Sequence, residues 1–204
     1  MDECNVTTHA AGCLWSNDGS KDTEVWAERR HIGKVYELSR TFAAVFGEAA
    51  VPSRVRPVYA DWPIFPKRYN ATLAWFNSTY GAPAKYLYAM AATGYFGAAP
   101  LKTPETYDQI YEGYRNSTAQ QAAPRAALAA IAQYWGLKLV AYEAGPGWGV
   151  GDTDNVGNFI VAQRLAPMRA VTAGDVQGWA DAGGDAYNHF SMTGLASRFG
   201  MWGQ

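Results

Sequence analysis

Segments with helical periodicity alternate with short apolar, β-branched runs along most of this chain, and this alternation limits the folds it can adopt. The periodicity predicts helices over 23–47, 69–80, 104–114, 124–135, 155–165 and 174–182. Thr23 is the candidate N-cap of the first helix. The apolar runs predict strands over 54–60, 86–92, 137–142 and 186–190. Helices that alternate with buried strands form right-handed βαβ units, so we expect a parallel sheet.

The predicted strands are too few to close a barrel, because a complete (β/α)8 barrel takes about 250 residues. We therefore predict an α/β fold: a partial (β/α)8 (TIM-type) barrel of about four parallel strands with flanking helices. It would span residues 23–204 as one domain, after a polar N-terminal segment over 1–22. The pattern alone leaves a small open-sheet domain as the alternative. A half-barrel would form a homodimer or pair with a missing N-terminal half, because exposed sheet edges attract further strands.

Charge and hydropathy exclude several classes of partner. The chain has 17 basic and 18 acidic residues and a formal net charge of −1, and its basic residues are scattered rather than clustered. Nucleic acid is therefore not an expected partner. No run of apolar residues is long enough to span a bilayer, so we expect no membrane partner. The first ten residues have neither a basic nor an apolar signal-peptide region, so we expect no signal peptide within this chain.

Glycosylation sequons and a cysteine pair point to an oxidising compartment. Four asparagines lie in Asn-x-Ser/Thr sequons: Asn5, Asn70, Asn77 and Asn116. The two cysteines, Cys4 and Cys13, are close enough in the chain to close a small disulfide loop, which fits a secreted, extracellular protein. Two free thiols remain the alternative. With His9, these cysteines still lack a fourth ligand at a usual spacing, so we predict no metal site.

Aromatic residues are abundant, with eight Trp and thirteen Tyr in 204 residues. Such rings stack on the apolar faces of sugars, and they also fill protein cores. Two catalytic motifs are missing from the sequence: there is no Gly-x-Ser-x-Gly elbow, and the glycine-rich stretch 145–151 lacks the Lys-Ser/Thr ending of a phosphate-binding loop. Carbohydrate is the ligand class that the composition favours.

Several short strings support a specific resemblance. The string Leu139-Val140-Ala141-Tyr142-Glu143-Ala144-Gly145 resembles the seventh strand of secreted (β/α)8-barrel glycoside-hydrolase-like, or cellulose-binding-type, proteins, which commonly read VAYEGG there. Segments 54–58, 92–97 and 182–190 are similar to their fifth, sixth and eighth strands. Segment 198–203 is similar to the stretch that follows the eighth strand, and the helix with 27–29 and 45–47 to the segment before the fifth. The resemblance covers roughly residues 23–203 and implies the C-terminal part of such a barrel.

The chain departs from this family pattern at two places. It has Ala144-Gly145 where the family has Gly-Gly after the glutamate. The fourth-strand Asn-Glu motif, where the family carries its acid/base, is not found: Asn17-Asp18 has no strand before it, and Glu24 and Glu28 lie in a predicted helix. A retaining glycosidase needs two carboxyl groups about 5–5.5 Å apart. Asp61, just past the first strand, is the other candidate carboxylate at the carboxyl ends of the strands. The simpler interpretation is that Asp61 is a turn residue.

Active sites of such barrels lie at the carboxyl ends of the strands. Glu143 is therefore the candidate nucleophile, with an ion pair to an Arg or a loop cap as the alternative. The resemblance implies that Tyr95 hydrogen-bonds this carboxylate. The residues expected to bind substrate at the same rim are Trp62, Trp148, Asn188, His189 and Trp202.

These observations predict a glycoside-hydrolase-like domain that acts on or binds a β-linked polysaccharide or oligosaccharide, without a cofactor. The alternatives are a non-catalytic carbohydrate-binding protein and a self-associating half-barrel. One of Asn188 and His189 should face the barrel interior, because neighbouring strand residues alternate between faces. A purely structural histidine is the alternative for His189.

Overall fold

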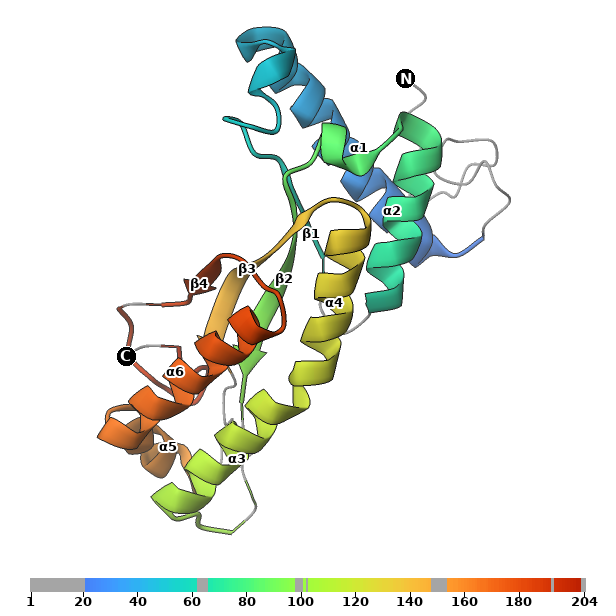
Figure 1. Cartoon of the computed structure of the whole chain (residues 1–204). Helices are drawn as coiled ribbons and strands as arrows, with labels where there is room; N and C mark the ends of the chain where they lie inside the picture. The colour runs from blue at the N-terminus through green and yellow to red at the C-terminus, as the bar shows by residue number, and fades with distance from the viewer. Residues whose placement is uncertain are drawn as a thin grey trace. The chain divides into compact units, whose positions relative to one another are not determined.

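The computed structural model describes residues 21–61, 66–97, 101, 103–147, 154–191 and 193–202 (Figure 1). Its helices are α1 (Thr23–Phe46), α2 (Pro66–Tyr80), α3 (Tyr107–Gln120), α4 (Ala122–Tyr134), α5 (Val156–Gln163) and α6 (Ala166–Asp181). Its strands are β1 (Val58–Ala60), β2 (Ala89–Phe96), β3 (Lys138–Pro146) and β4 (Tyr187–His189). Two short 3-10 helices are η2 (Glu48–Ala50) and η3 (Pro83–Lys85).

The strands form one parallel sheet in the order β1-β2-β3-β4, flanked by helices. Each strand therefore lies beside the next one in sequence, as in a chain of βαβ units. This confirms the predicted α/β class, and the arrangement is consistent with part of an α/β barrel. In such a sheet the carboxyl ends of all strands lie on one edge, where ligands of open α/β sheets bind.

Several predicted boundaries were wrong. β1 occupies only Val58–Ala60 of the predicted 54–60 strand, whose first half carries two arginines. β2 begins later than predicted and continues through 93–96, which we had predicted as a loop. β3 likewise extends to Pro146, so Glu143 lies within the strand rather than after it. In both strands, burial and pairing with neighbours keep a glycine, Gly94 in β2 and Gly145 in β3, within the strand despite its low strand propensity.

The first turns of two helices also differ from expectation. Asp22, not Thr23, caps α1, and its carboxylate accepts hydrogen bonds from the backbone N–H groups of Glu24 (2.9 Å) and Val25 (3.4 Å). The third helix does not begin at Pro104: Thr106 caps α3 in a reciprocal capping box with Gln109. Asp and Thr side chains at these positions satisfy backbone donors that a helix start leaves unpaired.

By its internal contacts the chain forms two compact units. The first contains the described residues within Met1–Tyr59, Phe65–Met90 and Ile131–Leu137. Here α1 packs on α2 around fully buried Ile32, Leu73 and Phe76. Tyr36 stacks on Tyr80 at 4.1 Å between ring centroids, so part of the aromatic content predicted to favour sugars fills this core instead.

The second unit contains the described residues within Ala60–Ile64, Ala91–Ala130 and Lys138–Gln204, and it holds the carboxyl ends of the strands. Helix α3 packs against both α5 and α6, which also contact each other. A buried cluster lies among them: Phe96, Ile110, Tyr111, Tyr114, Phe159, Ala162, Met168, Val171 and Met201. This apolar core supports the end of β2 from one side.

Part of α1 carries apolar side chains that the first unit does not bury. Leu38, Phe42, Val45 and Phe46 are all more than 40% exposed, although their helical spacing was part of the pattern that predicted the helix. The buried face of this half of α1 is made instead by Ser39 and Ala43. None of the described helices combines the length and the apolar character needed to cross a membrane.

Candidate functional site

Glu143 lies at an irregularity in the pairing of β3 with β4. Ala141 pairs with Tyr187 and Ala144 pairs with His189, so three steps on β3 oppose two on β4. The extra residue falls at Tyr142–Glu143. A β-bulge of this kind re-aims side chains and is common beside active sites. The bulge also removes strict alternation, so sequence spacing could not predict which way Glu143 points.

Tyr95, near the carboxyl end of β2, donates a hydrogen bond from its hydroxyl to Glu143 Oε2 at 2.8 Å. The structure thus brings together two residues that lie 48 positions apart. Burial, then this hydrogen bond and the charge of Glu143, raise the pKa of Tyr95 above its usual value. The phenol therefore stays protonated and remains a donor to the carboxylate. Within the described ranges, no Lys or Arg forms an ion pair with Glu143.

A second carboxylate lies within electrostatic reach of the same site. The pKa of Tyr142 is raised mainly by burial, and further by the charges of Glu143 and Asp61. Asp61 follows β1, and its backbone N–H donates to the carbonyl of Ala91 on β2 at 3.2 Å. The charges of both carboxylates therefore act on the hydroxyl of Tyr142, which is 40% exposed.

The glycines that follow Glu143 allow close packing around it. A Cβ on Gly147 would lie 2.5 Å from a ring carbon of Tyr95, so only a glycine lets this loop contact the phenol ring. The backbone N–H of Gly147 also donates to the carbonyl of Phe96 at 3.0 Å. The methyl group of Ala144 fits because it faces Gly94, which has no side chain. The structure thus accommodates Ala144 where the resembling motif has glycine.

His189, at the end of β4, packs against Gly145 of β3. A Cβ on Gly145 would lie 2.8 Å from its Cε1. Burial lowers the pKa of His189, and the charge of Asp175 opposes this in part, so the imidazole is neutral at pH 7. Its Nε2 is buried and has no hydrogen-bond partner within the part of the chain described. Asn188, in contrast, is exposed.

The other predicted substrate-binding and modification residues fall in different places. Trp202 is 36% exposed and packs edge-to-face against Phe190, just past β4. The predicted stacking residues Trp62 and Trp148, the cysteines Cys4 and Cys13, and the sequon Asn5 lie outside the described residues.

The three described sequon asparagines, Asn70, Asn77 and Asn116, all lie exposed on helices. In the Asn70 sequon, both the asparagine and the threonine form side-chain hydrogen bonds. Asn70 Oδ1 accepts a hydrogen bond from Trp135 Nε1, and the hydroxyl of buried Thr72 donates to Glu28. Glycosylation of these positions stays a prediction.

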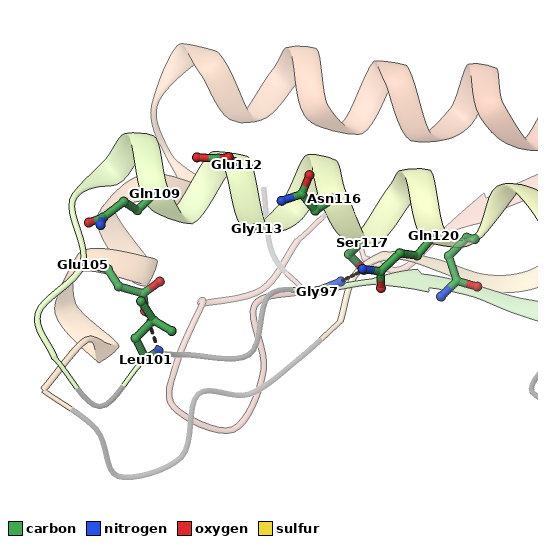
Figure 2. Close-up of a pocket in the computed structure, with 10 residues that line it drawn as sticks. Gly97, Leu101, Glu105, Gln109, Glu112, Gly113, Asn116, Ser117 and Gln120 are labelled. Atoms are coloured by element: carbon green, nitrogen blue, oxygen red, sulfur yellow. Dashed lines mark hydrogen bonds between the residues drawn. The ribbon is translucent and has the colours of Figure 1, made fainter.

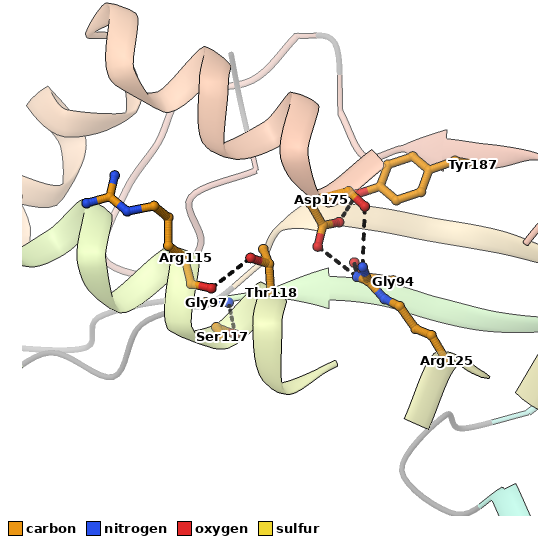
Figure 3. Close-up of polar contacts among 8 residues, drawn as sticks. All are labelled: Gly94, Gly97, Arg115, Ser117, Thr118, Arg125, Asp175 and Tyr187. Carbon is orange, nitrogen blue, oxygen red and sulfur yellow. Dashed lines mark hydrogen bonds and ion pairs between the residues drawn. The ribbon is translucent and has the colours of Figure 1, made fainter. Parts of the chain in front are cut away.

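Sequence reasoning missed a buried polar network behind the site (Figure 3). Arg125 of α4 pairs with Asp175 of α6 at 2.8 Å, and the two side chains are 4% and 0% exposed. Tyr187 of β4 donates to the other oxygen of Asp175 at 2.7 Å, and Arg125 donates to the carbonyl of Gly94 on β2 at 3.3 Å. The network therefore ties β2 and β4 to two helices: Gly94 directly precedes Tyr95, and Tyr187 lies two residues before His189. No local motif marks it, because Arg125 and Asp175 are 50 residues apart.

Within the described residues, no group of three or more His, Cys, Asp or Glu side chains could hold a metal ion. The chain matches no protein-family model, no curated protein and no solved structure.

Proposed function

We propose that the Tyr95–Glu143 pair belongs to a glycosidase-type site that acts on or binds a β-linked polysaccharide. The observation that carries the proposal is the hydrogen bond from Tyr95 to Glu143 at the carboxyl edge of a parallel sheet. A carboxylate held by one neutral donor keeps its second oxygen available for an electrophile. In a glycoside that electrophile is the anomeric carbon, whose developing positive charge a carboxylate stabilises.

The roles of Tyr95 and His189 follow from their protonation, and the role of Asp61 from the charge that it shares with Glu143 at Tyr142. Tyr95 stays protonated, so it orients Glu143 rather than competing for a proton. Asp61 is the described carboxylate that shares the electrostatic surroundings of Tyr142 with Glu143, which makes it the candidate proton donor or water-activating base. Neutral His189 packs against Gly145, two residues after Glu143, and so supports the strand that carries this carboxylate.

Aryl β-glycosides with good leaving groups test the catalytic role, because they need little help from a general acid. Glu143→Gln is expected to lower kcat/KM by at least about 10²-fold. Tyr95→Phe removes one charge-assisted hydrogen bond and is expected to cost roughly 10-fold or more. Azide added to Glu143→Ala should restore turnover and release a glycosyl azide, since it takes the place of the missing nucleophile.

Glu37→Gln is the matched control, because Glu37 is a carboxylate of α1 paired with Lys34 and lies in the first unit. It is expected to match the unmodified protein. Equal rates for Glu143→Gln and the unmodified protein would contradict a catalytic role for Glu143.

A non-catalytic carbohydrate-binding protein is the second candidate function. Two observations favour it: the sequence lacks the Asn-Glu motif of the acid/base, and Trp202 and Phe190 are exposed beside the site. Retention on insoluble β-glucan that persists in Glu143→Gln but is lost in Trp202→Ala would support binding without turnover. Retention equal in all three proteins would exclude this site as the binding surface.

A further inference from the structure

Gly94 of β2 makes a close contact with the neighbouring strand β3. A Cβ added at Gly94 would lie 2.8 Å from the Cβ of Ala144, closer than two side-chain carbons pack. Glycine therefore lets the backbone of β2 approach the methyl group of Ala144. Tyr95 directly follows Gly94, and Glu143 directly precedes Ala144. In both strands the contact thus lies one residue away from a partner of the Tyr95–Glu143 hydrogen bond.

The backbone carbonyl of Gly94 is held by a buried guanidinium group (Figure 3). Arg125 Nη2 donates to this carbonyl at 3.3 Å and to Asp175 Oδ1 at 2.8 Å. Its other terminal nitrogen, Nη1, donates to the backbone carbonyl of Asp175 at 3.3 Å. The carbonyl of Gly94 and the N–H of Tyr95 belong to one planar peptide group. Arg125 therefore restrains the peptide plane from which the Tyr95 side chain starts.

Two further contacts restrain the chain on either side of Tyr95. The ring of Tyr187 packs against Gly94, since an added Cβ there would lie 3.5 Å from its Cε2. Beyond Tyr95, the backbone N–H of Gly97 donates to Ser117 Oγ of α3 at 3.1 Å (Figure 2). Tyr95 therefore lies on a short segment that is anchored both before and after it.

The Tyr95–Glu143 hydrogen bond depends on this placement. Its two oxygen atoms are 2.8 Å apart, and a hydrogen bond weakens steeply when its angle becomes unfavourable or its length grows. The phenol belongs to β2 and the carboxylate to β3. A shift of β2 against β3 would therefore change this distance directly, even if the sheet stayed paired.

We infer that Arg125 and Ala144 are positioning residues for this hydrogen bond. Arg125 fixes the peptide that joins Gly94 to Tyr95. Ala144 sets how closely β2 approaches β3 and so, together with Arg125, holds the Tyr95 hydroxyl on Glu143. The effect on the hydrogen bond follows from these contacts alone, while its consequence for turnover rests on the proposed function.

NMR of the protein labelled at the Cζ atom of its tyrosines measures this hydrogen bond without any substrate. Tyr95→Phe assigns the Tyr95 signal, and Glu143→Ala gives the position of the signal when the carboxylate is absent. Gly94→Ala should move the signal toward that position, because the new methyl group meets Ala144 and separates the two strands. The backbone of Gly94 lies outside the left-handed region, so alanine adds this overlap without strain in φ.

The double variant Gly94→Ala/Ala144→Gly is the rescue. It moves one methyl group from β3 to β2 and so keeps the volume at the contact, which buried sites tolerate best. The other neighbours of the new Cβ, on Ala141 and Tyr187, would lie 3.5 Å away, an ordinary contact distance. The Tyr95 signal should return to its position in the unmodified protein. Recovery by a second substitution identifies the contact itself, rather than a general loss of stability, as the cause.

Arg125→Lys tests the second restraint. Lysine keeps a positive charge beside Asp175, but one ammonium group cannot reproduce the planar fork that reaches Asp175 and the carbonyl of Gly94 together. We expect the Tyr95 signal to move in the same direction as in Gly94→Ala. The two strand variants decide the inference even if Arg125→Lys does not fold by circular dichroism.

Tyr111→Phe is the matched control. Tyr111 is a buried residue of the same unit, and its hydroxyl donates to the carbonyl of Ala162 at 2.9 Å. This variant also loses a buried hydrogen bond, but one that is not connected to β2. It should leave the Tyr95 signal unchanged.

Turnover of aryl β-glycosides measures the functional consequence. Gly94→Ala and Arg125→Lys are each expected to lower kcat by about 10-fold with little change in KM, because they misplace the reacting carboxylate and its donor rather than remove them. The double variant should recover most of this loss. If the unmodified protein turns over no glycoside, the proposed function fails, while the NMR result still decides the inference.

Three results would overturn the inference. The first is an unchanged Tyr95 signal in Gly94→Ala or in folded Arg125→Lys. The second is a double variant whose signal stays where Gly94→Ala placed it. The third is a shift in Tyr111→Phe as large as that in Arg125→Lys, which would show that any loss of core stability moves the phenol.

Discussion

Replacing Arg125 with Met is expected to lower the free energy of unfolding at neutral pH by about 3–5 kcal/mol. Asp175 is fully buried, and Arg125 is the cation that pairs with it, at 2.8 Å. Without Arg125 the carboxylate keeps only the hydrogen bond from Tyr187 at 2.7 Å as its side-chain partner in the network. An uncompensated buried charge costs far more than the net contribution of the pair itself. Urea unfolding measures the loss.

The cost of this substitution should depend on pH. Burial raises the pKa of Asp175, and the charge of Arg125 is the largest opposing effect, so the folded-state pKa rises further when Arg125 is removed. The unfolded chain loses this proton near its ordinary pKa of about 3.9, while the folded variant still holds it. The stability of the variant therefore falls as pH rises from about 4 toward the folded-state pKa. The difference from the unmodified protein should be smallest in acid and largest at neutral pH.

Two further variants test this explanation. Adding Asp175→Asn to Arg125→Met removes the buried charge, so it should recover part of the lost stability at neutral pH. Lys138→Met removes the cation of an exposed pair with Asp185 and should cost no more than about 1 kcal/mol. An Arg125→Met penalty that is the same at acid and neutral pH would show that lost packing, not the charge of Asp175, causes the effect.

Gly145→Ala is expected to cost about 2–5 kcal/mol of stability and to displace the His189 ring. The backbone of Gly145 has φ +119°, a conformation that residues with a Cβ rarely adopt. The new methyl group would also lie 2.8 Å from Cε1 and 3.0 Å from Nδ1 of His189. Backbone strain and steric overlap therefore add. Thermal or urea unfolding gives the stability loss, and the imidazole proton resonances of His189 report the displacement.

Gly174→Ala is the control, because this substitution is expected to raise the free energy of unfolding rather than lower it. Gly174 lies within α6, where an added Cβ would meet no atom within 4 Å. Alanine should therefore stabilise the helix by roughly 0.5–1 kcal/mol. If Gly145→Ala were as stable as the unmodified protein, that result would contradict the close packing of His189 against Gly145 of β3.

The sequence by itself determined the order of the elements. Helical periodicity and β-branched runs are local patterns, so α1, α2 and the four strands could be identified before any contact was known. Local pattern also placed Glu143 near the end of a strand. It could not place the strand ends, because Gly94 in β2 and Gly145–Pro146 in β3 are poor strand formers that nevertheless lie within paired strands.

Only the tertiary structure decided which residues face one another. The Tyr95–Glu143 hydrogen bond joins positions 48 apart, and Glu143 lies at the bulge in β3, which the alternation of side chains along a strand cannot predict. The Arg125–Asp175 pair likewise joins side chains that lie 50 residues apart in the sequence. Such contacts are set by strand register and helix packing. Glu143 was therefore visible in the sequence and the resemblance named Tyr95 as its partner, whereas the orientation of Glu143 and the buried network of Arg125 and Asp175 required the fold.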